Sequence, residues 1–383
     1  MVFLKKIQNA FKHVGSGKNL TIWTLIRNVS PYFLSPQGNA KSPLTIYFSV
    51  NSVCNLTCQM CDIGQKNSES SFYKNLQPES PKEKLDFDRL QELIGEISNF
   101  DPQPRVSVTT TEPFLYPDLF RLSELVSSHG MEFQVTTNGA YLKKHMDEIF
   151  SSGISELCIS VDGPGEIHNE IRGKAGLYES IVADLTEIQE RKRKQKINKP
   201  VITIATVISN FNYKFIADLY YDFPEDIYDI AIVSHMNFMD EKMVEAHNKD
   251  FSNIGNAVMA GLPGACKPDK VNVGDLWNQI LHIKANKPKI KISPDFNQKD
   301  LEVFYKDSME FVWDNTCYIP WFVMEILSNG DAIPLTRCFN LKLGNIYENS
   351  ISEIWNGESY RKLRKELIKN KRFPVCTRCR GIL

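Results

Sequence analysis

Six short apolar segments alternate with amphipathic segments over residues 44–233, and this alternation restricts the fold of the 383-residue chain more than any other feature. The apolar segments predict strands at 44–49, 105–109, 132–136, 155–161, 201–208 and 228–233. The amphipathic segments predict helices at 86–99, 117–129, 141–151, 177–193 and 213–222. Strands joined by helices pair in parallel, because each crossover brings the chain back over one face of the sheet. Six such units predict an α/β fold, an open and partial (β/α)6 barrel of the TIM-like type.

We expect the barrel at residues 44–235. The rest of the chain divides into three parts. Residues 1–43 predict an N-terminal helical extension, and residues 236–311 predict a bridging region. From about residue 312 a hairpin around 328–331 and two short helices predict a small α+β domain over 312–383.

Composition and charge exclude several classes of protein. With 42% hydrophobic and 11% aromatic residues the chain can bury a sizeable core. The formal net charge of −1 predicts no nucleic-acid partner, and no apolar run reaches the roughly 18–20 residues of a membrane helix. Leu4, Ile7 and Phe11 lie at helical spacing among charges that a signal peptide would lack. We therefore expect a helix docked on the body of a cytoplasmic protein, with contact to a membrane surface as the alternative.

Cysteine spacing points to metal or redox chemistry. An odd number of cysteines without a secretion signal argues against a disulfide framework. Cys54, Cys58 and Cys61 form a CxxxCxxC motif after the first predicted strand, followed by the polar stretch 65–84, which predicts a surface loop. Three close thiolates can hold three corners of a [4Fe–4S] cluster and leave one iron open to a small molecule. The other six cysteines are Cys158, Cys266, Cys317, Cys338, Cys376 and Cys379.

Two of these cysteines stand alone. Cys158 lies in a predicted strand, where we expect a buried small hydrophobic side chain. Cys266 lies in a loop with nothing nearby that would lower its pKa, so an inert thiol is the favoured interpretation over a reactive one.

The CxxxCxxC spacing, with the apolar Met60 before the last cysteine, resembles the signature of the radical S-adenosylmethionine (SAM) superfamily. The resemblance implies a catalytic [4Fe–4S] cluster on Cys54, Cys58 and Cys61, with SAM bound at the open iron. Family members usually carry a Gly-Gly-Glu-Pro-like motif after the second strand, and the equivalent here is Thr110-Thr111-Glu112-Pro113.

That equivalence implies that Glu112 binds the SAM amino group, with the backbone carbonyls of Thr110 and Thr111 as further ligands. The alternative for Glu112 is a surface carboxylate. Branched threonines restrict the backbone where glycine permits close approach, so the local geometry differs from that of the family.

Three further residues correspond to SAM contacts of the family. Asn138 follows the third predicted strand, although Asn138-Gly139 also reads as a turn. Ser160 ends the fourth strand, and the resemblance implies contact with the SAM ribose or carboxylate. Arg172 would hold the SAM carboxylate with its planar fork, or else form an ordinary structural ion pair.

The four C-terminal cysteines (Cys317, Cys338, Cys376, Cys379) are interspersed with Gly344-Asn345-Ile346 and Glu353-Ile354-Trp355-Asn356. This succession resembles the SPASM or twitch auxiliary-cluster domain of radical SAM enzymes. The full SPASM pattern has seven cysteines, so four imply one auxiliary [4Fe–4S] cluster. Zinc on the same four thiolates is the alternative.

The resemblance implies reductive cleavage of SAM to a 5′-deoxyadenosyl radical that removes hydrogen from substrate, with an external electron donor such as flavodoxin or ferredoxin. Only about 43 residues precede the first strand, fewer than the roughly 80 of a leader-binding module. We therefore expect a sugar-like or other small substrate that is oxidised or epimerised. The alternatives are a maturase of a ribosomally made peptide and a non-catalytic iron–sulfur or zinc protein. His235, after the sixth strand, is either a substrate contact or a packing residue.

Overall fold

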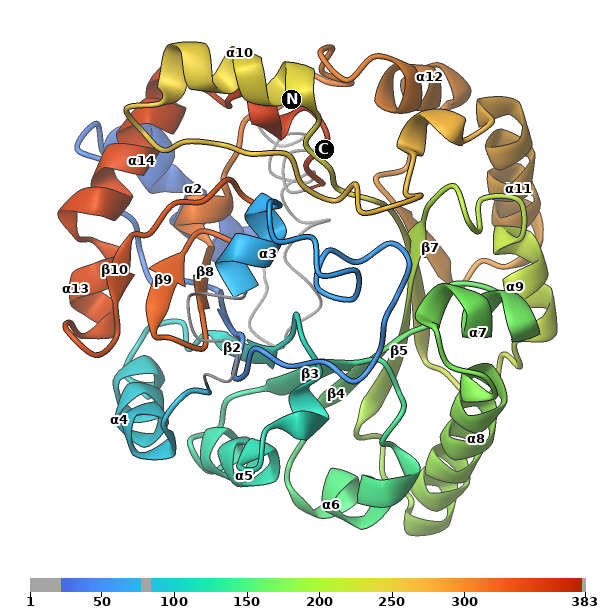
Figure 1. The fold of residues 1–383 in the computed structure, drawn as a ribbon. Helices are drawn as coiled ribbons and strands as arrows, with labels where there is room; N and C mark the ends of the chain where they lie inside the picture. The colour runs from blue at the N-terminus through green and yellow to red at the C-terminus, as the bar shows by residue number, and fades with distance from the viewer. Residues whose placement is uncertain (1–21, 77–83, 381–383) are drawn as a thin grey trace.

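The computed structural model of the chain describes residues 22–76 and 84–380, and the helix predicted near the N-terminus lies outside these residues. The strands are β1 (Thr45–Phe48), β2 (Arg105–Val108), β3 (Phe133–Thr137), β4 (Glu156–Ser160), β5 (Val201–Ile208), β6 (Ile230–His235), β7 (Ile290–Ser293), β8 (Val323–Ile326), β9 (Asp331–Ile333) and β10 (Gly344–Asn345). Helices surround the sheet on its outer side (Figure 1).

The helices in chain order are α2 (Ile22–Leu34), α3 (Ser71–Leu76), α4 (Phe87–Ser98), α5 (Leu119–Ser128), α6 (Met146–Ser151), α7 (Gly165–Arg172), α8 (Leu177–Gln195), α9 (Ile216–Asp222), α10 (Glu241–Phe251), α11 (Val273–Asn286), α12 (Gln298–Lys306), α13 (Ile351–Trp355) and α14 (Glu358–Asn370). Short 3₁₀ helices include η1 (Pro113–Leu115), η4 (Ile319–Trp321) and η5 (Pro374–Cys376). No helix in the described ranges is long and apolar enough to cross a membrane.

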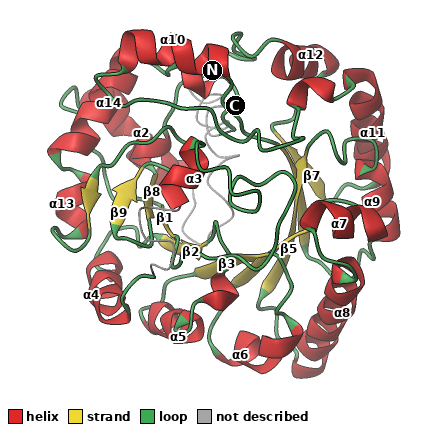
Figure 2. Ribbon diagram, in the orientation of Figure 1, coloured by secondary structure: helices red, strands yellow, loops and turns green. Residues whose placement is uncertain are grey.

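The described strands form one open sheet in the order β10-β9-β8-β1-β2-β3-β4-β5-β6-β7 (Figure 2). The six predicted strands are β1 to β6, and they pair in parallel as expected. The α/β fold and the partial barrel are therefore confirmed. Two more parallel strands extend the sheet: β7, from the predicted bridging region, pairs with β6, and β8 pairs with β1.

The C-terminal hairpin is thus part of the barrel sheet. The predicted turn joins β8 to the antiparallel β9, and β8 lies in register with β1, with Thr45 opposite Val323. The first and last parts of the described chain therefore share one sheet.

The sheet is apolar on its outer face and polar on its inner face. Successive side chains of a strand point to opposite faces, so register partners in neighbouring parallel strands share a face. Ile46, Phe48 and Val108 face the helices and are fully buried. The inner face carries a row of polar side chains in register: Glu325, Tyr47, Ser107, Gln134 and Glu156. The interior of a closed TIM barrel is filled mainly by branched apolar residues, so this polar interior is available for chemistry.

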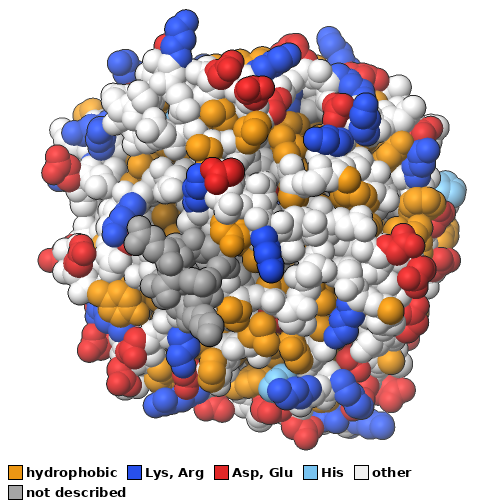
Figure 3. Space-filling model, in the orientation of Figure 1, with side chains coloured by type: hydrophobic (Ala, Val, Ile, Leu, Met, Phe, Trp, Pro, Cys, Tyr) orange, Lys and Arg blue, Asp and Glu red, His pale blue; other side chains and the backbone are white. Residues whose placement is uncertain are grey.

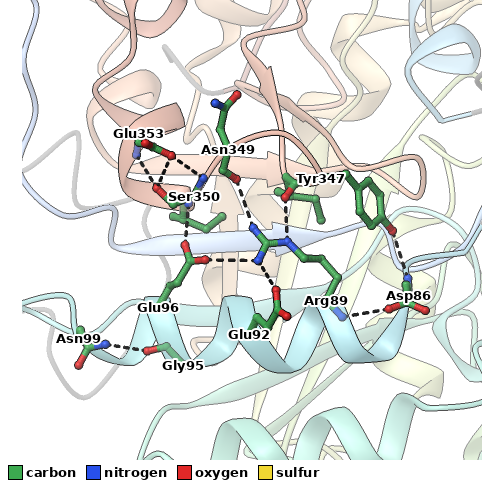
Figure 4. Close-up of polar contacts among 12 residues, drawn as sticks. Asp86, Arg89, Glu92, Gly95, Glu96, Asn99, Tyr347, Asn349, Ser350 and Glu353 are labelled. Carbon is green, nitrogen blue, oxygen red and sulfur yellow. Dashed lines mark hydrogen bonds and ion pairs between the residues drawn. The ribbon is translucent and has the colours of Figure 1, made fainter.

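Helix α4 fastens the C-terminal region to the barrel (Figure 4). Arg89 of α4 donates from Nε to the carbonyl of Ile346 at 2.8 Å and from a terminal nitrogen to the carbonyl of Asn349 at 3.2 Å. Its guanidinium is oriented by Glu92 at 2.6 Å and Glu96 at 3.4 Å.

The predicted surface loop at 65–84 is partly wrong. Residues 71–76 form α3, and Ser71 and Asn75 are buried. Asn75 donates from Nδ2 to the carbonyl of Thr336 at 2.8 Å, which ties this segment to the C-terminal region. A polar composition is typical of a surface loop. In this segment, however, the polar side chain of Asn75 is buried and bonded to a residue far along the chain, which the local sequence does not indicate.

Candidate active site

The three cysteines of the CxxxCxxC motif lie on the loop that leaves the carboxyl end of β1. Cys58 is buried, Cys61 is half-buried and Cys54 is exposed. Burial, followed by the charge of Cys58, raises the pKa of Cys61 to about 11. Burial also raises the pKa of Cys54, with a smaller contribution from Cys58. The three thiols therefore lie close enough to interact, and iron would displace their protons on binding.

Close backbone packing fixes the shape of this loop. A Cβ atom at Gly64 would lie 2.7 Å from the backbone nitrogen of Cys58, so the loop returns past this cysteine only with glycine there. Gln65 donates from Nε2 to the carbonyls of Thr57 at 2.9 Å and Cys58 at 3.1 Å. These contacts position Cys58 before any metal binds.

Arg172, the last residue of α7, lies against the cysteine loop. A terminal nitrogen of its guanidinium is 3.8 Å from Sγ of Cys58, and the guanidinium forms an ion pair with Asp162. Burial disfavours the charge of Arg172, but Asp162 and Cys58 hold its pKa above the usual value. In this structure Arg172 therefore makes the structural ion pair, and contact with a SAM carboxylate stays a prediction.

Glu112 lies between the carboxyl ends of β2 and β3 and has none of its surface exposed. Oε1 accepts hydrogen bonds from Oγ1 of Thr137 at 2.8 Å and the backbone N–H of Phe114 at 3.1 Å, and Oε2 accepts one from the N–H of Asn138 at 2.9 Å. Burial raises the pKa of Glu112, whereas these bonds and Arg172 lower it. Glu112 is not a surface carboxylate. Oε2 retains capacity for another donor, as binding of an amino group requires.

The other residues of the predicted SAM set connect the cysteine loop to the strand ends. Asn138 donates from Nδ2 to Oδ1 of Asn55 at 2.8 Å, within the CxxxCxxC loop. Thr111 donates to the carbonyl of Asn51 at 2.8 Å, just after β1. Thr110 has a φ of 88°, a backbone conformation that glycine adopts readily and threonine rarely. The restriction that branched threonines place on the backbone is therefore felt at Thr110.

Ser160 and Cys158 face the interior of the barrel from β4. Both are half-buried, and the side chain of Ser160 has no hydrogen bond within residues 22–76 and 84–380. Alternation along β4 turns Cys158 toward the interior and away from the helices, and burial raises the pKa of its thiol to about 12, in agreement with a small buried side chain. Ser160 remains a predicted SAM contact.

The four C-terminal cysteines come together from separate segments. Cys317 precedes η4, Cys338 follows β9, and Cys376 and Cys379 lie at and after η5. Burial, followed by the charges of Cys379, Cys317 and Cys376, raises the pKa of Cys338 well above its usual value. Burial and then Cys379 raise the pKa of Cys376 to about 12.

A single zinc ion and a [4Fe–4S] cluster require different arrangements of the thiols. Two thiolates on one tetrahedral zinc lie about 3.8 Å apart, given zinc–sulfur distances near 2.3 Å. No three Cys, His, Asp or Glu side chains in the described part of the chain are grouped to hold one ion. A [4Fe–4S] cluster places each thiolate on a different iron and so requires wider spacing. Cys54, Cys58 and Cys61 would hold three irons, and the four C-terminal cysteines would ligate a second cluster fully.

Two side chains outside this set are packing residues. His235 points to the outer face of the sheet, where Nδ1 lies 2.8 Å from the hydroxyl of Tyr305 and the ring packs on Phe296. Burial lowers the pKa of His235 to about 3, so the structure favours packing over substrate contact. Cys266 is fully buried beside Met236, and burial raises its pKa to about 12, in agreement with an inert thiol.

Sequence reasoning missed the interior residue Tyr47. The alternation of Thr45, Tyr47 and Ser49 with apolar residues along β1 is a signal that could have placed Tyr47 inside the barrel.

The family model for the radical SAM superfamily matches residues 48–220, and the model of the SPASM iron–sulfur cluster-binding domain matches residues 317–380. The chain belongs to the radical SAM superfamily. It is a radical SAM enzyme with a catalytic [4Fe–4S] cluster, SAM and a SPASM auxiliary iron–sulfur cluster.

Known relatives of this radical SAM enzyme are distant. The tungsten-containing aldehyde ferredoxin oxidoreductase cofactor-modifying protein of Pyrococcus furiosus is 21% identical over 87% of this chain and 86% of its own length. The Fe-coproporphyrin III synthase of Methanosarcina barkeri is 26% identical, but over 42% of this chain and 37% of its own. The crystal structure of Streptococcus suis SuiB bound to precursor peptide SuiA has a TM-score of 0.59 at 15% identity, and the likeness covers 95% of this chain and 78% of that one.

Proposed function

We propose that this radical SAM enzyme removes a hydrogen atom from a small polar molecule held inside the barrel and oxidises it by two electrons in a biosynthetic reaction. SAM and the two clusters, when bound, supply hydrogen abstraction and acceptance of the second electron. After the hydrogen atom and the second electron have left, the substrate would lose one proton to solvent. Epimerisation, in which a hydrogen atom returns to the substrate, is the other outcome that the same site would support.

The polar row on the inner face of the sheet carries this proposal. Ser107 donates to Oε1 of Gln134 at 3.0 Å within that row, and Tyr47 lies beside them with its hydroxyl unpaired in the described part of the chain. Polar groups inside a barrel are retained where they hydrogen-bond a ligand, since burying them unpaired is costly. A small molecule with several hydroxyl or amino groups fits such a lining.

The relatives support a small substrate as well. The relative that aligns over most of both chains is named for modifying a cofactor, and the Methanosarcina relative is named for making a coproporphyrin. Both names describe small molecules. The likeness to SuiB extends to the fold alone, so a peptide substrate remains an outcome of the test.

An anaerobic reconstitution would test this proposal. We expect about eight irons per chain, about four in the variant in which Cys54, Cys58 and Cys61 are replaced by alanine, and 5′-deoxyadenosine from the wild type only. Extracts separated into small molecules and peptides should then be supplied in deuterated water and in ordinary water. A small molecule that loses two hydrogens supports oxidation, and one that gains a single deuterium supports epimerisation. A modified peptide with no modified small molecule would overturn the proposed substrate class.

A further inference from the structure

We propose that Asp62 and Asn237 are positioning residues that couple the loop of the catalytic cluster to the loop of the auxiliary cluster through the uncharged segment 254–266. This inference rests on the proposed function and adds positioning residues to it. A two-electron oxidation requires the substrate radical, formed at one cluster, to lie within electron-transfer reach of the other. A continuous line of hydrogen bonds and close packing joins the two loops.

The catalytic end of this line is Asp62, which follows the cluster ligand Cys61 and is buried. Oδ1 of Asp62 accepts a hydrogen bond from Nδ2 of Asn67 at 2.7 Å, a partner close by in the chain. Oδ2 accepts one from the backbone N–H of Gly261 at 2.8 Å, and Gly261 lies 199 residues further along. The second bond therefore ties the catalytic loop to a distant segment.

That segment, residues 254–266, follows α10 and carries no charged side chain. Ala260 and Met239 exchange two backbone hydrogen bonds, of 2.8 and 3.0 Å, in an antiparallel bridge. Ser71 of α3 donates from Oγ to the carbonyl of Val258 at 3.0 Å. In Figure 1 the segment is the gold trace that crosses the view after α10, and in Figure 3 the charged side chains lie mainly around the margin of this face. Backbone and hydroxyl hydrogen bonds, rather than ion pairs, thus fix the segment in place.

The auxiliary end of the line is Asn237, which lies just after β6. Oδ1 of Asn237 accepts a hydrogen bond from the backbone N–H of Arg380 at 2.7 Å, and Arg380 directly follows the cluster ligand Cys379. Asn237 also packs on the uncharged segment: a Cβ atom at Gly261 would overlap the carbonyl oxygen of Asn237, and Gly261 has a φ of 72°. Gly261 therefore donates to Asp62 on one side and packs against Asn237 on the other.

Both cysteine loops extend beyond the sheet, so strand pairing does not by itself set the separation of the two clusters. Cys61 lies beyond the carboxyl end of β1, and Cys379 lies after η5. Bonds that hold the residues next to metal ligands also orient the ligands. Electron transfer slows steeply as the gap between donor and acceptor widens. A fixed separation therefore serves a substrate radical that must lose one electron to the auxiliary cluster and one proton to solvent.

The test measures the separation of the clusters in the enzyme loaded with both, reduced, and free of SAM and substrate. Pulsed electron paramagnetic resonance reports the magnetic interaction between the two reduced clusters, which falls with the cube of their separation. Asn237→Ala and Asp62→Ala break the line from opposite ends, and each should broaden the range of separations. Hydrogen exchange should become about 10-fold faster at the amide of Arg380 in the first variant and of Gly261 in the second.

Two variants are matched controls. Asn237→Asp keeps an oxygen for the amide of Arg380, and Asn67→Ala removes the local bond of Asp62 while leaving its bond to Gly261. Both should keep the range of separations of the wild type. Equal broadening in Asn237→Asp and Asn237→Ala, or in Asn67→Ala and Asp62→Ala, would overturn the proposal. So would faster exchange with unchanged separations.

Gly261→Ala keeps the measurement decisive if either of the other alanine variants loses a cluster. It presses on the carbonyl of Asn237 and alters no side chain next to a cluster ligand. Broadened separations in Gly261→Ala would support the proposal, and unchanged ones would overturn it. Substrate plays no part in these measurements, so a small molecule that is not oxidised would count against the proposed function alone.

Discussion

Thr110 occupies a backbone conformation in which a β-branched side chain is strained, at the position where the family usually carries glycine. Its φ of 88° lies in the region that L-residues avoid, at a cost of roughly 1–2 kcal/mol. Its hydroxyl lies 2.6 Å from that of Ser49, which offsets part of this cost. The strained conformation of Thr110 thus places its hydroxyl against Ser49, at the end of the strand that leads into the cysteine loop.

We expect Thr110→Gly to be more stable than Thr110→Ala by about 1 kcal/mol, because both lose the hydroxyl but only glycine relieves the strain. At Thr111 the order should reverse, since its φ is not in the left-handed region. Urea unfolding followed by circular dichroism would measure both pairs. The same order at the two positions would show that Thr110 is not strained.

A second residue-scale prediction concerns Arg172. Its contact with Sγ of Cys58 brings a positive charge and a hydrogen-bond donor to a cluster ligand, and both stabilise the reduced cluster. Arg172→Gln should lower the reduction potential of the catalytic cluster. Arg172→Lys, which keeps the positive charge, should lower it much less. Titration followed by electron paramagnetic resonance measures the change. An unchanged potential with weakened SAM binding would instead support the SAM-carboxylate role.

At the scale of elements, the sequence predicts those whose periodicity is strong and misses those that depend on distant partners. Helix α8 and strand β5 could be predicted from their own patterns. β7 is a four-residue strand that alternates isoleucine with a lysine, and it is specified mainly by pairing with β6. α7 is short and strongly polar, so nothing local predicted the helix that delivers Arg172.

The residues of the candidate site also divide into those that a local pattern indicates and those that depend on pairing between distant segments. Spacing along the chain pointed to Cys54, Cys58 and Cys61, and resemblance to the SPASM domain pointed to the four C-terminal cysteines. Tyr47 and Glu325 lie side by side only through the pairing of β8 with β1, which no local pattern encodes. Contacts between remote segments are what a single sequence reveals least.

The contact between α4 and the C-terminal region gives an element-scale prediction. Arg89→Ala removes two charged hydrogen bonds to the carbonyls of Ile346 and Asn349, and should destabilise this docking by about 2 kcal/mol. Hydrogen exchange over residues 344–353 should then be faster, and a chelator should remove auxiliary-cluster iron sooner. The control Arg193→Ala removes an exposed arginine 3.9 Å from Asp226 and should change neither rate.

At the scale of the whole molecule, two buried histidines make stability depend on acidity. Burial lowers the pKa of both His168 and His235 from 6.5 to about 3. The unfolded chain therefore binds protons on these rings at a higher pH than the folded protein does. Their contribution to stability is complete above pH 6.5 and is lost as the pH falls toward 3, by up to roughly 5 kcal/mol per histidine.

His168→Gln tests this dependence. In the wild type the backbone N–H of Asp162 donates a hydrogen bond to Nδ1 of His168 at 3.0 Å, and the amide oxygen of glutamine can accept the same bond without titrating. We expect a shallower loss of the free energy of unfolding between pH 6.5 and pH 4 in this variant, measured by urea titration at each pH. Replacing the exposed His129 by glutamine is the comparison. An identical slope in both variants would mean that His168 is protonated in the folded protein.

The pairing of β8 with β1 also determines the order in which the protein can be completed during synthesis. β1 leaves the ribosome long before its neighbour β8 is made. Until then β1 presents an unpaired edge, the feature by which incomplete chains join one another. The cysteine loop that follows β1 emerges in the same interval, next to a sheet still missing its final strands. The sheet that supports both clusters is thus completed only after β8 has been synthesised.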